Sequence, residues 1–133
     1  MTPLNTKIIF RFLGITAILN SFFMFIAYPF SLYHNENAKW GILGAGAVTI
    51  IIGLLLYFFN KPKNTYIHKK EGYLIVTLGW LILSFTGMLP YLLSGTIPDI
   101  SNAFFETISG YSTTGSSILT DIESMPKGIL FWR

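Results

Sequence analysis

The sequence has 133 residues, of which 52% are hydrophobic and 17% aromatic, whereas only 11% carry a formal charge. A soluble domain carries about 25% charged residues, and so short a chain has much surface to cover. The composition therefore excludes a disordered tail and most soluble enzymes, and it indicates an integral membrane protein. The net charge of +3 comes from scattered basic residues, so nucleic acid is not an expected partner. Without cysteine, thiolate metal sites and cysteine nucleophiles are excluded.

Three runs without Lys, Arg, Asp or Glu divide the chain, at residues 12–35, 40–60 and 72–98. They contain 24, 21 and 27 residues, and an α-helix needs about 20 to cross the apolar core of a bilayer. The first run is too long for a signal peptide and lacks a small-x-small cleavage pattern. We therefore expect an all-α protein in the lipid bilayer, with three transmembrane helices and a basic cytoplasmic loop at 61–71.

The basic residues predict the orientation of these helices. Segments 1–11 and 61–71 contain six of the nine Lys and Arg residues, and segments 34–39 and 99–133 contain three. Cytoplasmic loops carry the excess of Lys and Arg, which places the N-terminus of a multi-pass inner-membrane protein in the cytoplasm. The six residues are Lys7, Arg11, Lys61, Lys63, Lys69 and Lys70.

Small residues on the second run predict close packing between helices, because they let two backbones approach each other in lipid. They are Gly41, Gly44, Ala45, Gly46 and Gly53.

The pattern changes after Pro98. Asp99 and the residues that follow it offer N-cap chemistry, and a short helix is expected from Ser101 to Gly110, where glycine favours an end. Such a helix is about 15 Å long, half of a bilayer core, so it is either interfacial or re-entrant. The next residues, 111–117, are small and rich in hydroxyl groups.

Two interpretations of this hydroxyl-rich segment have equal support from its chemistry. One is a cation filter, in which backbone carbonyls replace the water shell of the ion and the half-helix directs its negative end toward the ion path. The other is a plain exposed Ser/Thr loop. Glu106 is the one carboxylate on the half-helix, either bracing the loop or binding an ion.

Enzymatic chemistry is not expected. The spacing around Ser112 is G-x-S-x-x-G, one residue longer than a nucleophile elbow, and no Walker Gly-Lys-Ser/Thr ending is present. His34 and His68 fall on opposite sides of the membrane in the predicted topology, so they do not form a metal site.

Four segments resemble the Trk/Ktr/HKT superfamily of potassium transporters, in particular its bacterial TrkH/TrkG membrane subunits. Asn102–Leu119 (NAFFETISGYSTTGSSIL) is similar to the first pore helix and filter strand, and 125–133 (MPKGILFWR) to the entry into the next helix. Residues 69–74 (KKEGYL) and 87–91 (GMLPY) resemble the entry and exit of the helix before the pore. This resemblance favours the filter over the plain loop.

The resemblance implies a role for each segment. Residues 1–60 would form two additional N-terminal helices, 72–94 the outer helix of the first membrane-pore-membrane repeat, and 95–133 the re-entrant pore half-helix, filter strand and entry to the next helix. The ion would be bound by the carbonyls of Ser112, Thr113, Thr114 and Gly115, and the filter supported by Glu106, Gly110 and Ser116. The family usually has Thr at the position of Ser112 and often Ala at that of Ser116; carbonyl ligands survive both changes.

The implied function is potassium uptake across the inner membrane, with H⁺ or Na⁺ as candidate coupled ions, no cofactor and no metal besides K⁺. The implied partners are a second copy of the full-length chain and a cytosolic nucleotide-binding regulator of the TrkA type. Since the family builds its pore from four repeats, we expect the sequence to be an N-terminal fragment of a longer transporter. The alternative function is a small helical membrane scaffold or assembly subunit with an exposed Ser/Thr-rich loop.

Overall fold

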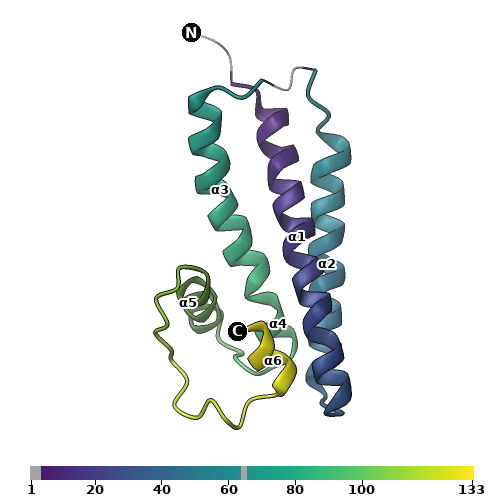
Figure 1. Ribbon diagram of the computed structural model, residues 1–133, viewed down its shortest axis with the longest axis vertical. Helices are drawn as coiled ribbons and strands as arrows, with labels where there is room; N and C mark the ends of the chain where they lie inside the picture. Colours follow the sequence, from purple (N-terminus) through teal and green to yellow (C-terminus); the bar gives the residue numbers. More distant parts are fainter. Residues whose placement is uncertain (1–3, 64–65) are drawn as a thin grey trace.

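Helices make up all the regular structure in residues 4–63 and 66–133, the part of the chain that the computed structural model describes (Figure 1). The predictions for residues 1–3 of the N-terminal segment and 64–65 of the basic loop lie outside these ranges. Three helical segments, Thr6–Tyr33, Ala38–Phe59 and Lys69–Leu93, are long and apolar enough to cross a membrane. The predicted all-α class is therefore confirmed. The elements are α1 (Thr6–Tyr33), α2 (Ala38–Phe59), α3 (Lys69–Gly87), α4 (Leu89–Leu93), α5 (Ile100–Tyr111) and α6 (Lys127–Trp132). The third of the membrane-length segments comprises two consecutive helices, α3 and α4.

The first two helices form an antiparallel pair. Asn5 caps α1, where its side chain accepts a hydrogen bond from the Ile8 N–H at 3.4 Å. After α1 the chain turns through Asn35, which has a left-handed φ of 56°, and α2 runs back along α1 (Figure 1). A turn this short leaves the two helices adjacent.

Small residues let α1 and α2 approach closely where they cross. A Cβ atom on Gly14 would lie 2.7 Å from the carbonyl oxygen of Gly53, and one on Gly53 would lie 2.9 Å from the Ile18 nitrogen. Near the middle of the pair, Ser21 donates a hydrogen bond to the Gly46 carbonyl at 2.9 Å. The packing expected of Gly46 and Gly53 is thus present, and larger side chains at either crossing glycine would separate the helices.

A buried carboxylate fixes the start of α3. Glu71 accepts hydrogen bonds from the His68 N–H at 2.9 Å and from the Asn5 N–H at 2.7 Å. The first contact satisfies a free N–H group at the helix start, and the second joins that start to the beginning of α1. At its far end α3 stops at Gly87 and α4 follows, because Pro90 has no N–H to continue the helical hydrogen bonds.

Two short helices lie beside the lower part of the three-helix bundle in Figure 1. The Asp99 side chain caps α5 by accepting from the Asn102 N–H at 2.8 Å. The 12-residue α5 is about 18 Å long and ends at Tyr111, one residue beyond the expected stop at Gly110. The Ser112 and Thr113 N–H groups close its last turn, so the Gly110 backbone stays helical.

A buried polar network joins α5 to the bundle. Asn20 of α1 donates to Thr86 of α3 at 2.9 Å and accepts from the Tyr111 hydroxyl of α5 at 2.7 Å. Nearby, the indole N–H of Trp132 donates to the Gly87 carbonyl at 3.0 Å. The two Asn20 contacts connect α1, α3 and α5 through a single amide side chain.

Glu36, in the turn between α1 and α2, holds the start of α6. It accepts hydrogen bonds from the Lys127 N–H at 2.6 Å, the Gly128 N–H at 3.2 Å and the Ser31 hydroxyl at 3.1 Å. Partial burial alone would raise the pKa of Glu36, but the three donors outweigh it and hold the pKa below its ordinary value. The N-terminal helix pair is therefore attached directly to the segment that follows the hydroxyl-rich loop.

Candidate functional site

The hydroxyl-rich loop after α5 separates its backbone donors from its backbone acceptors. The N–H groups of Ser112, Thr113, Thr114 and Gly115 all point back to α5: the first two donate to the carbonyls of residues 108 and 110, and the other two to that of residue 109, at 2.9 to 3.3 Å. Within the described ranges, no hydrogen bond reaches any of their four carbonyl oxygens. Since backbone carbonyls are strong acceptors, four consecutive unpaired ones form a ready set of oxygen ligands.

Two residues in this loop have left-handed backbones. Thr113 has φ of 58° and Gly115 has φ of 74°. The cost is small for glycine but not for threonine, which rarely adopts this region. The alternation of left-handed and ordinary residues keeps the segment from continuing the helix.

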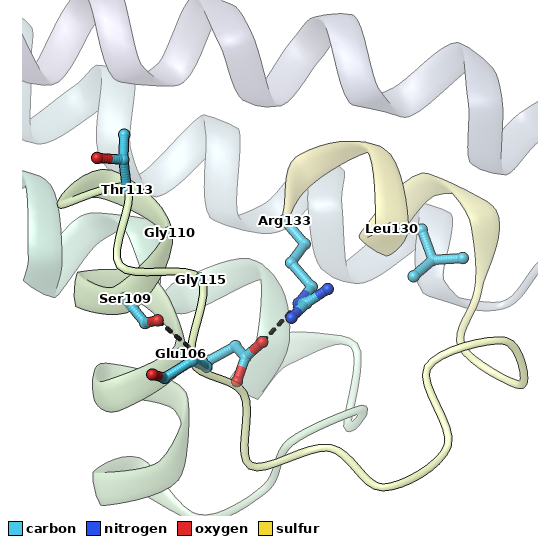
Figure 2. A pocket seen from close by; sticks show the side chains of 8 residues that line it. Glu106, Ser109, Gly110, Thr113, Gly115, Leu130 and Arg133 are labelled. Atoms are coloured by element: carbon cyan, nitrogen blue, oxygen red, sulfur yellow. Dashed lines mark hydrogen bonds and ion pairs between the residues drawn. The ribbon is translucent and has the colours of Figure 1, made fainter.

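Ser109 holds the loop from both directions. Its carbonyl accepts from the Thr114 N–H at 3.1 Å and the Gly115 N–H at 3.3 Å, and its hydroxyl donates to the Ser116 carbonyl at 2.5 Å. The last contact is drawn in Figure 2. A single buried serine near the end of α5 thus fixes both ends of the segment 114–116.

Glu106 braces the far side of the loop. Its carboxylate, 2% exposed, accepts two contacts from the Ser117 hydroxyl at 3.0 and 3.2 Å and one from the Ile118 N–H at 3.2 Å. It also forms an ion pair with Arg133, whose Nε atom lies 2.5 Å from Oε1. In Figure 2 these two side chains point toward each other across the cavity. In all of these contacts the carboxylate oxygens are the acceptors, so Glu106 braces the loop.

A cavity of about 330 Å³ lies between the loop, the end of α5 and α6 (Figure 2). It has a mixed polar and apolar lining and is large enough for an ion with several waters. The lining residues are Glu106, Ser109, Gly110, Thr113, Gly115, Ser116, Leu130 and Arg133.

Five of the seven residues proposed from the sequence line this cavity. The other two, Ser112 and Thr114, lie beside it and join their hydroxyl groups at 2.7 Å. Among the supporting residues, Glu106 and Ser116 accept the hydrogen bonds described above. Gly110 faces α6, where a Cβ would lie 3.3 Å from the Arg133 carbonyl.

Sequence reasoning missed Ser109, Ser117 and Arg133 as parts of the site. A signal for Arg133 was present, because it is a basic residue at the end of an apolar segment and Glu106 is an acid within another. Two opposite charges in apolar surroundings are expected to pair. No local signal marks the serines, whose roles depend on the loop folding back onto α5.

Three helices long and apolar enough to cross a membrane, with a half-length helix and a hydroxyl-rich loop packed beside them, are typical of an α-helical integral membrane protein. A family model described as TrkH, cation transport protein, matches residues 39–133. The chain therefore belongs to the TrkH family of cation transport proteins.

Individual relatives agree with this assignment. The chain is 34% identical to the Trk system potassium uptake protein TrkH of Escherichia coli (strain K12) over 132 residues, which is 98% of this chain and 27% of the relative. It is 38% identical to an uncharacterized cation transporter of Methanocaldococcus jannaschii over 103 residues, 77% of this chain and 21% of the relative.

The fold is similar to the crystal structure of the potassium transporter TrkH from Vibrio parahaemolyticus. The TM-score is 0.89 with 29% identity, covering 97% of this chain and 28% of that one. The chain thus spans about a quarter of the length of the relatives it matches.

Proposed function

We propose that this chain contributes the first filter segment of a potassium uptake transporter of the inner membrane. The observation that carries the proposal is the arrangement at 112–115, where every N–H is used by α5 and no carbonyl has a partner among the residues that the structure describes. Relatives named as potassium uptake proteins support K⁺ as the transported ion.

In this proposal α5 is a re-entrant pore helix and the carbonyls of Ser112, Thr113, Thr114 and Gly115 coordinate K⁺. The C-terminal end of α5 adds a partial negative charge near the ion. Ser109 and Glu106 hold the loop from behind, so the oxygens keep their spacing when water leaves the ion. Ser112 and Ser116 differ from the residues that the family usually or often has there, but the differences affect only side chains. This supports retention of the carbonyl ligands.

The orientation has the N-terminus in the cytoplasm, supported by the six basic residues at one end of the bundle. Inward movement of one K⁺ is favoured by about 2.3 kcal/mol per 100 mV of membrane potential. Coupling to H⁺ or Na⁺, pairing of full-length chains and a TrkA-type cytosolic regulator belong to the same proposal. They are tested by uptake under imposed H⁺ and Na⁺ gradients and by co-purification of the full-length protein.

The filter is tested by replacing Gly115 with Ala in the full-length transporter and measuring Rb⁺ uptake in cells without other potassium importers. Gly115 has φ of 74° and open space around its Cα, so Ala adds only backbone strain of about 1–2 kcal/mol. Gly95 is a matched control, with φ of 72°, equally open space and a position outside the loop.

We expect Gly115→Ala to reduce Rb⁺ uptake and discrimination against Na⁺, because relief of the strain turns the ligand carbonyls. Gly95→Ala should retain both at equal expression. Equal uptake and selectivity in the two variants would show that this loop is not the filter.

A further inference from the structure

Positive charge accumulates at the end of the bundle where α1 and α3 begin and α2 ends, at the top of Figure 1. Five exposed lysines and one half-buried arginine lie there. Among the described residues, the pair of Arg133 and Glu106 is the one ion pair with a nitrogen–oxygen distance within 4 Å. None of these six basic groups is therefore paired with a carboxylate of the described ranges. The six are Lys7, Arg11, Lys61, Lys63, Lys69 and Lys70.

The single acid at this end is already engaged. Glu71 is 2% exposed, and its two oxygens accept from the N–H groups of Asn5 and His68. The Glu71 carboxylate is therefore buried and hydrogen-bonded to two backbone N–H groups. The charged groups that the structure describes as exposed at this end of the bundle are all basic.

A groove of about 250 Å³ lies beside these charges, between the first turns of α1 and the loop after α2. Phe12 and Ile15 are 38% and 43% exposed along it, and Arg11 stands among them. One guanidinium next to an open apolar groove fits an amphiphile with an anionic head. The lining residues are Ile8, Arg11, Phe12, Ile15 and Pro62.

Tyr57 holds the guanidinium of Arg11 in place. Nη2 of Arg11 donates to the tyrosine hydroxyl at 3.0 Å, and the guanidinium carbon lies 4.6 Å from the ring centroid. A guanidinium has five N–H donors, so this contact leaves others to bind two oxygens of a phosphate. The stacking reduces the entropy lost when a ligand binds.

We propose that the Arg11 groove binds an anionic phospholipid. The phosphate of the lipid contacts Arg11, the neighbouring lysines attract its charge, and one acyl chain lies along Phe12 and Ile15. Basic pockets at the ends of transmembrane helices select anionic head groups in this way. This binding does not depend on potassium passing the loop after α5, which lies toward the other end of the bundle in Figure 1.

The test measures binding of phosphatidylglycerol, phosphatidylcholine and soluble glycerol phosphate to the full-length transporter in neutral detergent, by native mass spectrometry and by thermal stability. We expect phosphatidylglycerol to bind and stabilise more than either other ligand. Arg11→Gln should lower that affinity by about tenfold, the effect of one charged hydrogen bond, and Arg11→Lys by less. Lys39→Gln, with the same charge change at the opposite end, should leave it unaltered.

A second variant keeps the test decisive if Arg11→Gln folds poorly. Ile15→Ser changes an exposed side chain of the groove and should weaken long-chain phosphatidylglycerol relative to a short-chain analogue. Equal binding of phosphatidylglycerol and phosphatidylcholine, equal stabilisation by glycerol phosphate, or unchanged affinity in both groove variants would each overturn the proposal.

Discussion

Replacing Glu106 by Gln tests whether the brace behind the loop controls ion passage. The substitution preserves the shape of the side chain but removes its charge. Arg133, whose side chain is 24% exposed, loses its partner, and the new amide places an N–H group near the Ile118 N–H. One of the two contacts from the Ser117 hydroxyl can remain, since Gln keeps one acceptor oxygen.

The magnitude follows from these contacts. Breaking a buried ion pair by removing one partner costs about 3–5 kcal/mol, and the partial exposure of Arg133 reduces this to about 2–3 kcal/mol. That shifts the equilibrium between the ordered and the displaced loop by roughly 30- to 150-fold. We expect lower Rb⁺ uptake, weaker discrimination against Na⁺ and a lower melting temperature of the full-length protein.

The control is Glu123→Gln, which neutralises an exposed acid in the segment between the loop and α6. The double variant with Glu106→Gln and Arg133→Gln should lose less stability than the sum of the losses in the two single variants, because it leaves no unpaired charge. If Glu106→Gln matches Glu123→Gln in uptake, selectivity and melting temperature, the carboxylate does not brace the loop.

Two further predictions concern the attachments to the bundle. Asn20→Ala leaves Tyr111 and Thr86 without their amide partner and should destabilise the protein by about 1–3 kcal/mol, seen as a lower melting temperature than that of Thr16→Ala, which removes a partly exposed hydroxyl bonded only to its own helix; equal values would contradict the network. The depressed pKa of Glu36 means that its stabilisation is complete above its ordinary pKa of about 4.5 and is lost as pH falls through the lower folded value. Acid should therefore destabilise the wild type more than Glu36→Gln, and parallel melting curves from pH 6 to 3 would refute this.

The sequence was sufficient for the elements with strong local signals. Run length and charge predicted the three long helices, and Asp99 marked the start of α5 by its capping chemistry. Hydroxyl-rich residues with a glycine located the loop, although residue chemistry alone left a plain loop equally supported. Pro90 is a local signal for the break after Gly87. The length of the uncharged run does not show this break, because the run continues past it.

The features that could not be predicted from the sequence are contacts between residues far apart in the chain. Tyr111 and Asn20 are 91 residues apart, and Glu36 and Lys127 are also 91 apart. Their pairing depends on how α5 and α6 pack on the bundle, which no local pattern encodes. The role of Ser109 likewise arises from the path of the loop, since many helices end in a serine that holds nothing.

In the proposed filter, the use of every N–H in residues 112–115 by α5 also bears on which ions the loop would reject. The backbone of these residues offers carbonyl oxygens and no free N–H group, so a chloride ion arriving there would meet partial negative charge from the backbone. In that proposal, exclusion of anions would follow from the direction of the backbone, and it would persist if every side chain of the segment were changed while the backbone kept its course.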